Sequence, residues 1–206
     1  MRYGDSDHVE PAPDAAEPPV AIKVLIAGGF GVGKTTLVGS VSEVRPLRTE
    51  ESLSEPGTYI DDLDGVERKS TTTVAMDFGQ IRISDSVILH LYGTPGQKRF
   101  LFMWDELARG ALGAVVTVDP RRLADSFPSI DYFERAGMPF VVAINHFEGS
   151  RPYPVTALRA ALDLAADTPL LRCDARQRAS SRDVLVALVD HALGRLDDGP
   201  VLTEIG

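Results

Sequence analysis

The stretch "KVLIAGGFGVGKTTLVGS", residues 23–40, decides the fold of this chain. Residues 24–27 are apolar without alternation, which is typical of a strand buried on both faces. From Thr35 onward the apolar residues have helical spacing. Between the two lies "GGFGVGKT", residues 28–35, which fits the pattern G-x-x-x-x-G-K-[ST] of a phosphate-binding loop.

The chemistry of phosphate binding explains this spacing. Glycines let the backbone adopt left-handed conformations and turn several N–H groups toward one anion, and the following helix N-terminus adds further N–H groups. In such a loop the Lys34 ammonium reaches the β- and γ-phosphates, and the Thr35 hydroxyl coordinates Mg²⁺. The expected nucleotide-binding residues of the loop are Gly28, Phe30, Gly31, Val32, Gly33, Lys34, Thr35 and Thr36.

Composition narrows the class of protein. With 206 residues and 44% hydrophobic content, the chain has material for one α/β core. A net charge of −9 argues against a nucleic-acid partner. The single cysteine, Cys173, cannot form an internal disulfide, so we expect a cytoplasmic protein. No apolar run approaches the roughly 20 residues that span a bilayer, so we expect no membrane insertion.

Both ends of the chain differ from its middle. Residues 1–19 combine acidic residues and prolines with almost no large apolar groups, which predicts a disordered leader. Residues 197–206 form a short tail without an apolar stripe. The expected folded domain is residues 20–196.

Strand and helix patterns alternate within this domain. Strands are predicted at 22–27, 87–92, 112–118, 139–144 and 169–172, and helices at 34–43, 98–109, 121–136, 155–166 and 181–196, the last behind a Ser180–Ser181 cap. Residues 73–83 and 86–93 are separated only by Ser84 and Asp85, too few for a crossover, so they must be antiparallel neighbours. We therefore predict a three-layer αβα fold of the P-loop NTPase type, with a mostly parallel sheet and one antiparallel edge strand.

Four further motifs follow the phosphate loop: "KSTTTVAMDF" (69–78), "LYGTPGQKRF" (91–100), "INHFE" (144–148) and "CDAR" (173–176). In this order they resemble the small Ras-like GTPases over residues 20–196. Among these, the chain looks most similar to bacterial MglA-like polarity switches and to conservon-encoded GTPases, which share Pro95 and lack an aspartate at the start of "GTPG". The resemblance implies a GTP- and Mg²⁺-dependent signalling switch with slow hydrolysis.

The first switch of such a GTPase contains a threonine that binds Mg²⁺ and the γ-phosphate. Thr71, Thr72 and Thr73 all stand at the end of a polar loop. The frame T-x-x-x-D-F resembles the family best with Thr73 in this role. The resemblance thus implies Thr35 and Thr73 as metal ligands.

The second switch begins at "GTPGQ". The resemblance gives the Gly96 N–H to the γ-phosphate and gives Gln97 the task of orienting the attacking water. The expected catalytic residues are therefore Gln97, Lys34 and Thr73. Gly93 stands where the family has the aspartate that holds a Mg²⁺-bound water, which predicts a greater dependence of the metal on threonine ligands.

The base-reading motif N-K-x-D has its counterpart in residues 145–148. A carboxylate can accept both donors on one edge of guanine, whereas adenine offers an acceptor there, so Glu148 would select guanine. His146, or Phe147, would stack on the base, and Asn145 would tie this loop to the phosphate loop. Asp174 and Ala175 belong to the final base-contact loop, where the Ala175 N–H would meet guanine O6.

Residues 45–69 are acidic and turn-rich without periodicity, which predicts a solvated loop. A sharper hypothesis is a built-in arginine finger from Arg45, Arg48 or Arg68. The resemblance also implies a roadblock-type regulator and a sensor-kinase-like protein as partners. Two alternatives to the GTPase switch stay open: a module that holds nucleotide with negligible hydrolysis, and an ATP-using phosphotransferase.

Overall fold

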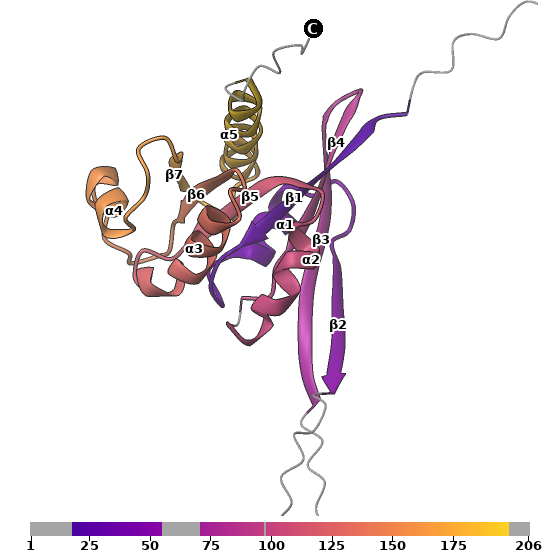
Figure 1. Ribbon diagram of the computed structural model, residues 1–206, viewed down its shortest axis with the longest axis horizontal. Coiled ribbons are helices and arrows are strands. Elements are labelled where there is room, and N and C mark those ends of the chain that lie inside the picture. The colour runs from indigo at the N-terminus through magenta and orange to yellow at the C-terminus, as the bar shows by residue number, and fades with distance from the viewer. Residues whose placement is uncertain (1–17, 55–70, 97, 198–206) are drawn as a thin grey trace, which may run out of the picture.

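The computed structural model describes residues 18–54, 71–96 and 98–197. Within them, seven strands form one sheet in the order β2-β3-β4-β1-β5-β6-β7 (Figure 1). Five strands run parallel to one another: β1 (Val20–Ala27), β4 (Val87–Gly93), β5 (Ala111–Val118), β6 (Phe140–Asn145) and β7 (Leu170–Cys173). Strand β3 (Thr71–Ser84) is antiparallel to β4. The predicted mostly parallel α/β sheet with one antiparallel strand is confirmed.

The edge of the sheet beside β3 differs from the prediction. Residues Leu47–Ser54, expected in a loop, form strand β2, which pairs antiparallel with β3 from Leu47–Phe78 to Ser54–Thr71. The edge strand is therefore β2, and β3 lies one place inside it. Figure 1 shows this two-stranded ribbon projecting beyond the helices. The sequence "LRTEESLS" carries no strand-like alternation, and backbone pairing with β3 provides the order that its side chains do not predict.

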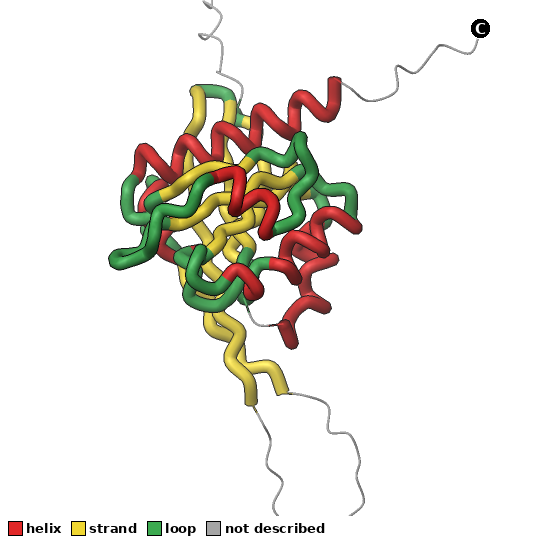
Figure 2. Tube along the Cα trace, turned by 90° about the vertical axis from the view of Figure 1, so that its left-hand side faces the viewer, coloured by secondary structure: helices red, strands yellow, loops and turns green. Residues whose placement is uncertain are grey.

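Helices cover both faces of the sheet (Figure 2). Helices α1 (Lys34–Val41) and α5 (Arg178–Asp197) share one core with the sheet, to which they contribute Leu37, Val38, Val41, Val184, Leu185 and Leu188. Helices α2 (Trp104–Ala108), α3 (Phe127–Arg135) and α4 (Val155–Ala161) share the other core, with Trp104, Ile130, Phe133 and Leu158. This is the predicted three-layer arrangement.

Several helix boundaries lie elsewhere than predicted. Two short 3-10 turns, η1 (Lys98–Met103) and η2 (Leu123–Asp125), precede α2 and α3. Helix α5 begins at Arg178, so Ser180 and Ser181 lie inside it and do not cap it. The Ser180 hydroxyl instead accepts a hydrogen bond from the Asp174 N–H, at 3.0 Å, and so holds the loop after β7.

None of the helices in the described ranges is long and apolar enough to cross a membrane. The proposed leader falls almost wholly on residues 1–17, and the proposed tail on residues 198–206, both outside the described residues. Cys173 is buried at the end of β7, where burial raises the pKa of its thiol.

Candidate nucleotide-binding site

The predicted site residues gather at one edge of the sheet, because parallel strands end at the same edge. The phosphate loop follows β1, Gly96 follows β4, Asn145 ends β6 and Asp174 follows β7. Tertiary pairing therefore brings together motifs that lie far apart in the sequence.

The phosphate loop has the backbone that its glycines predict. Gly28, Gly31 and Gly33 have φ values of 130°, 72° and 103°, in the region that side chains disfavour. A Cβ atom on Gly28 would lie 2.3 Å from the Thr117 carbonyl oxygen, so this position also has no room for a side chain. Helix α1 begins at Lys34, within the last residues of the loop. This geometry forms a cradle for an anion at a helix N-terminus.

Lys34 folds back over the loop that precedes it. Its ammonium donates hydrogen bonds to the carbonyl oxygens of Gly28 at 2.9 Å and Gly29 at 2.7 Å. Burial lowers the pKa of Lys34 to about 8, although the nearby Asp77 carboxylate works in the opposite direction. A phosphate in the cradle would favour the charged form of Lys34.

Thr35 contacts a residue that the sequence analysis did not assign. Its hydroxyl donates a hydrogen bond of 2.5 Å to Oδ2 of Asp77, which lies on β3. No group of three or more His, Cys, Asp or Glu residues placed to hold a metal occurs among the described residues. Mg²⁺ at nucleotides typically uses one or two carboxylates together with phosphates and water. A hydroxyl and a carboxylate beside the phosphate loop are therefore a donor set that fits Mg²⁺.

Gly96 lies directly against the phosphate loop, as its predicted role requires. A Cβ atom on Gly96 would lie 2.6 Å from the Lys34 ammonium and 2.8 Å from the Gly29 carbonyl oxygen. The next residue, Gln97, lies outside the described residues, so its role stays a prediction.

Thr73 does not have the position that the resemblance implied. It lies within β3, paired with Ser52, and not in a loop. Because a strand rises about 3.3 Å per residue, the backbone of Thr73 is about 13 Å from that of Asp77. In this conformation Asp77, and not Thr73, is the β3 residue beside Thr35.

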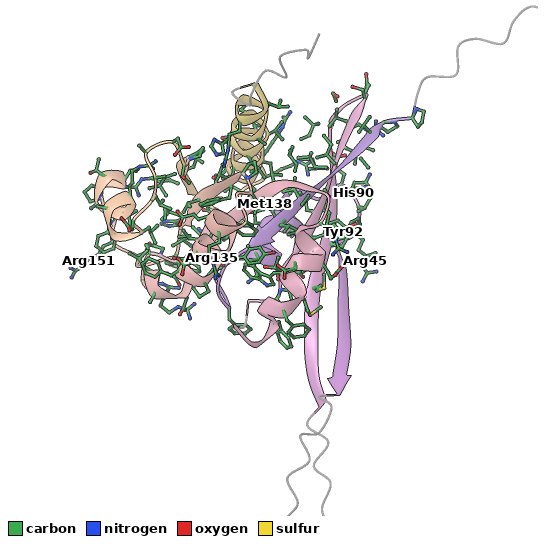
Figure 3. All side chains as sticks on the ribbon, viewed as in Figure 1. Arg45, His90, Tyr92, Arg135, Met138 and Arg151 are labelled. Carbon is green, nitrogen blue, oxygen red and sulfur yellow. The ribbon has the colours of Figure 1, made fainter. Side chains whose placement is uncertain are left out.

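Two of the three candidate arginines lie at or beside the edge strand of the sheet. Arg48 lies in β2, paired with Asp77, and Arg45 is exposed just before β2. Figure 3 shows Arg45 where β2 begins, in the same part of the view as His90 and Tyr92. Arg68 lies outside the described residues.

Asn145 links the base-reading loop to the phosphate loop, as predicted. Its side-chain amide donates a hydrogen bond of 3.0 Å to the Val32 carbonyl, and a Cβ atom on Gly33 would lie 2.4 Å from the same nitrogen. The amide oxygen accepts a hydrogen bond of 3.0 Å from the Ala175 N–H. The Ala175 N–H, assigned to guanine O6 by resemblance, is thus bonded to Asn145 in this structure.

The rest of the base-reading motif is largely exposed to solvent. His146 and Glu148 are exposed, whereas Phe147 is half-buried. The Arg121 guanidinium lies over the Phe147 ring, 4.1 Å from its centroid. Arg121 makes two hydrogen bonds, of 2.9 and 2.7 Å, to the buried Asp119 carboxylate, and these hold the pKa of Asp119 below its ordinary value.

The sequence analysis missed Asp119 and Arg121. Their position directly after β5 was the available signal, since loops at the carboxyl ends of parallel strands form sites in this fold class. In the loop after β7, the Asp174 carboxylate bonds to the Arg176 guanidinium, which holds the pKa of Asp174 well below its usual range. Asp174 therefore orders its own loop here.

A separate cavity of about 600 Å³ lies beside this loop, with His146, Tyr153, Arg172 and Asp174 among its lining residues. None of its lining residues belongs to the phosphate loop. It is therefore distinct from the anion cradle, although it adjoins the base-reading segment.

Comparisons with known proteins agree with this geometry. The family model described as "Conserved hypothetical ATP binding protein" matches residues 26–195. An uncharacterized protein of Methanocaldococcus jannaschii, MJ1339, is 35% identical over 126 residues, covering 60% of this chain and 69% of the relative. An elongation factor G-like protein of Mycobacterium tuberculosis is 26% identical over 98% of this chain, which spans 28% of that protein.

Solved structures with a similar fold include the G domain of the T. maritima FeoB iron transporter. That domain has a TM-score of 0.56 and 15% identity, covering 84% of this chain and 99% of the domain. The FeoB cytosolic domain in a GDP form has a TM-score of 0.60 and 15% identity, covering 85% of this chain and 64% of that chain. At these identities the likeness concerns the fold alone.

Proposed function

This chain belongs to the family of conserved hypothetical ATP-binding proteins, and from that premise we propose that it is a small GTPase acting as a slow, Mg²⁺-dependent switch. It is a nucleotide-binding P-loop protein with a G-domain-like fold. The observation that carries the proposal is the hydrogen bond from Asn145 to the Val32 carbonyl. This bond fastens the loop that carries Glu148 to the phosphate loop, which supports the proposal that Glu148 reads the base of a nucleotide bound there.

The proposed base specificity follows from hydrogen-bond chemistry. Glu148 is exposed, so its carboxylate is available to a ligand. Guanine would offer it two donors, whereas adenine would present an acceptor and no amine on the same edge. The second candidate function is an ATP-using phosphotransferase. The family's description favours it, and so does the Ala175 N–H, which bonds to Asn145 and is therefore not directed at guanine O6.

Hydrolysis is the finer part of the proposal. Bound Mg²⁺ would offset negative charge on the β- and γ-phosphates. Lys34 and the Gly96 N–H would hold the same phosphates, and Gln97 would orient the attacking water. If the bound GTP is not hydrolysed, the protein is instead a module that holds nucleotide with negligible turnover. By its resemblance to the MglA-like switches, we also propose a roadblock-type regulator as partner.

Calorimetric titration with GTP, GDP and ATP tests the base assignment. We expect ATP to bind at least about 10³-fold more weakly than GTP, since a carboxylate that faces adenine keeps unpaired acceptors. Glu148→Ala should weaken GTP binding and narrow this gap. Glu134→Ala, which removes an exposed glutamate from α3, is the matched control and should change neither affinity.

Lys34→Ala should abolish tight binding of every nucleotide, since Lys34 is the cation of the phosphate loop. A folded Lys34→Ala variant with unchanged GDP affinity would overturn the phosphate-loop assignment. Comparable affinity of the wild type for ATP and GTP would instead favour the ATP-using phosphotransferase.

A further inference from the structure

The loop after β5 holds two arginines against one buried carboxylate. The Asp119 side chain is buried directly after the strand, whereas the side chains of Arg121 and Arg122 are about half exposed. Arg121 makes the closer contacts with this carboxylate and lies over the Phe147 ring of the base-reading segment. The Arg122 Nε lies 3.5 Å from Oδ2 of the same carboxylate. Asp119 therefore anchors both cations, and one of them lies beside the base-reading segment.

Arg122 reaches the phosphate loop. Its Nη2 donates a hydrogen bond of 3.1 Å to the Phe30 carbonyl oxygen, and a Cβ atom on Gly31 would lie 3.7 Å from the same nitrogen. The Arg122 Nη1 lies 3.3 Å from Oδ2 of Asp125, in the turn η2. That turn lies against the start of the loop, since a Cβ atom on Gly29 would be 2.8 Å from the Asp125 Cβ. Residues that follow β5 thus hold the guanidinium at the middle of the phosphate loop.

Lys34 and Arg122 contact neighbouring parts of this loop. Lys34 bonds to the carbonyl oxygens of its first two residues, and Arg122 bonds to that of the third, Phe30. A guanidinium has five N–H donors. The three contacts of Arg122 take at most one N–H from each nitrogen, so a second N–H on each terminal nitrogen is left for a ligand. A phosphate is a stronger acceptor for these donors than a peptide carbonyl, because it is charged.

From this arrangement we propose that Arg122 is a second cation of the nucleotide site and binds a phosphate group of a nucleotide held in the phosphate loop. Its planar fork can donate to two phosphate oxygens at once, whereas the ammonium of Lys34 acts as a point charge. The inference rests on the proposed function in one respect, that the loop binds a nucleotide. It does not depend on the base, so it applies to guanine and adenine nucleotides alike.

The test measures GDP and ADP binding by calorimetry in Arg122→Gln and in the wild type, at low and at high salt. Glutamine keeps hydrogen-bond donors but removes the charge. We expect the affinity for whichever nucleotide the wild type binds to fall roughly 10- to 100-fold at low salt, because a charged hydrogen bond is lost. The loss should shrink as the salt concentration rises, because ions screen a half-exposed charge. A mere brace between the two loops would not give this salt dependence.

Asp125→Asn separates the two roles of Arg122 by the sign of its effect. It removes the ion pair with Arg122 but keeps the size of the side chain beside Gly29. We expect nucleotide to bind roughly two- to fivefold more tightly, because the guanidinium is released from a competing carboxylate. A brace would instead be weakened, and binding would weaken with it. Arg135→Gln, which removes an exposed arginine from the end of α3, is the matched control and should change neither the affinity nor its salt dependence.

Unchanged nucleotide affinity in a folded Arg122→Gln variant would overturn the inference. A loss of equal size at low and high salt, shared by Asp125→Asn, would also overturn it and leave Arg122 as a brace. If Arg122→Gln does not fold, Asp125→Asn decides alone, and binding no tighter than in the wild type overturns the inference. A wild type that binds neither nucleotide would overturn the proposed function itself. Preference of the wild type for ADP would overturn only its guanine specificity, and the effect of Arg122→Gln would then be measured with ADP.

Discussion

The Lys34 ammonium combines burial with the proposed role in phosphate binding, and together these predict that its protonation responds to a bound ligand. In the unfolded chain a lysine titrates near 10.5, whereas in the fold the pKa of Lys34 is about 8. Between these values the unfolded state binds more protons, so the contribution of this group to stability rises with pH across that window. A phosphate at the ammonium favours the charged form and raises its pKa again.

Nucleotide binding should therefore take up protons above about pH 8 and weaken as the pH rises further. The measurement is calorimetric titration in two buffers of different ionisation enthalpy, at about pH 7 and at about pH 9. We expect the binding enthalpies in the two buffers to agree at the lower pH and to differ at the higher one. Buffer-independent enthalpies at both pH values would show that Lys34 does not change its protonation on binding.

Individual residues differ in how far the sequence could predict them. The glycines and Lys34 of the phosphate loop were predictable, because one contiguous motif specifies their backbone and neighbours. The contact between Asp77 and Thr35 was not, because it depends on the register between β3 and β4 and on the pairing of β4 with β1. A motif records spacing along the chain, and register is set by the whole sheet.

Among the elements, the β2–β3 ribbon differs most from the sequence prediction. Its first strand is rich in polar residues, so propensity alone favours a loop, and the strand depends on its pairing with β3. The same pairing holds Thr73 in the sheet. If Thr73 is the switch threonine, residues 71–76 must leave their partners 49–54 when a γ-phosphate binds, because an extended strand keeps Thr73 about 13 Å from Asp77.

Hydrogen exchange of the backbone amides tests this rearrangement. With a non-hydrolysable GTP analogue bound, the amides of β2 and of the first half of β3 should exchange faster than with GDP bound, because their inter-strand hydrogen bonds are broken. Thr73→Ala should remove the difference between the two nucleotides, whereas Thr72→Ala, its neighbour in the same run, should keep it. Equal exchange in both nucleotide states of the wild type would exclude Thr73 from the γ-phosphate site.

On the scale of the whole molecule, the order of strands and helices was predictable, because continuous apolar runs alternate with helical stripes and end in recognisable loops. The convergence of phosphate loop, Gly96 and Asn145 at one edge follows from parallel topology. The source of the positive charge that GTP hydrolysis needs could not be predicted from sequence, because it depends on where the arginines of residues 45–69 lie when nucleotide and partner are bound.

Single-turnover phosphate release, measured with and without the proposed roadblock-type partner, tests whether an arginine supplies this positive charge. Without an arginine finger, small GTPases hydrolyse at about 10⁻⁴ to 10⁻³ s⁻¹, and a finger adds roughly 10³- to 10⁵-fold. We expect the isolated protein to be in the slow range and the partner to accelerate it. Gln97→Leu should slow hydrolysis both in the isolated protein and in the presence of the partner, because leucine cannot orient water. GTP binding should stay intact.

The source of the acceleration is then assigned by replacing arginines one at a time. Arg45→Ala and Arg68→Ala are measured separately. The variant that lacks the finger arginine should lose the acceleration by the partner. Arg135→Ala is the matched control. Arg135 ends α3, which leads into the start of β6, whereas the site lies at the carboxyl ends of the parallel strands. Equal rates for wild type and Gln97→Leu under both conditions would remove Gln97 from the mechanism. No release at all from the wild type, alone or with the partner, would instead identify the protein as a module that holds its nucleotide.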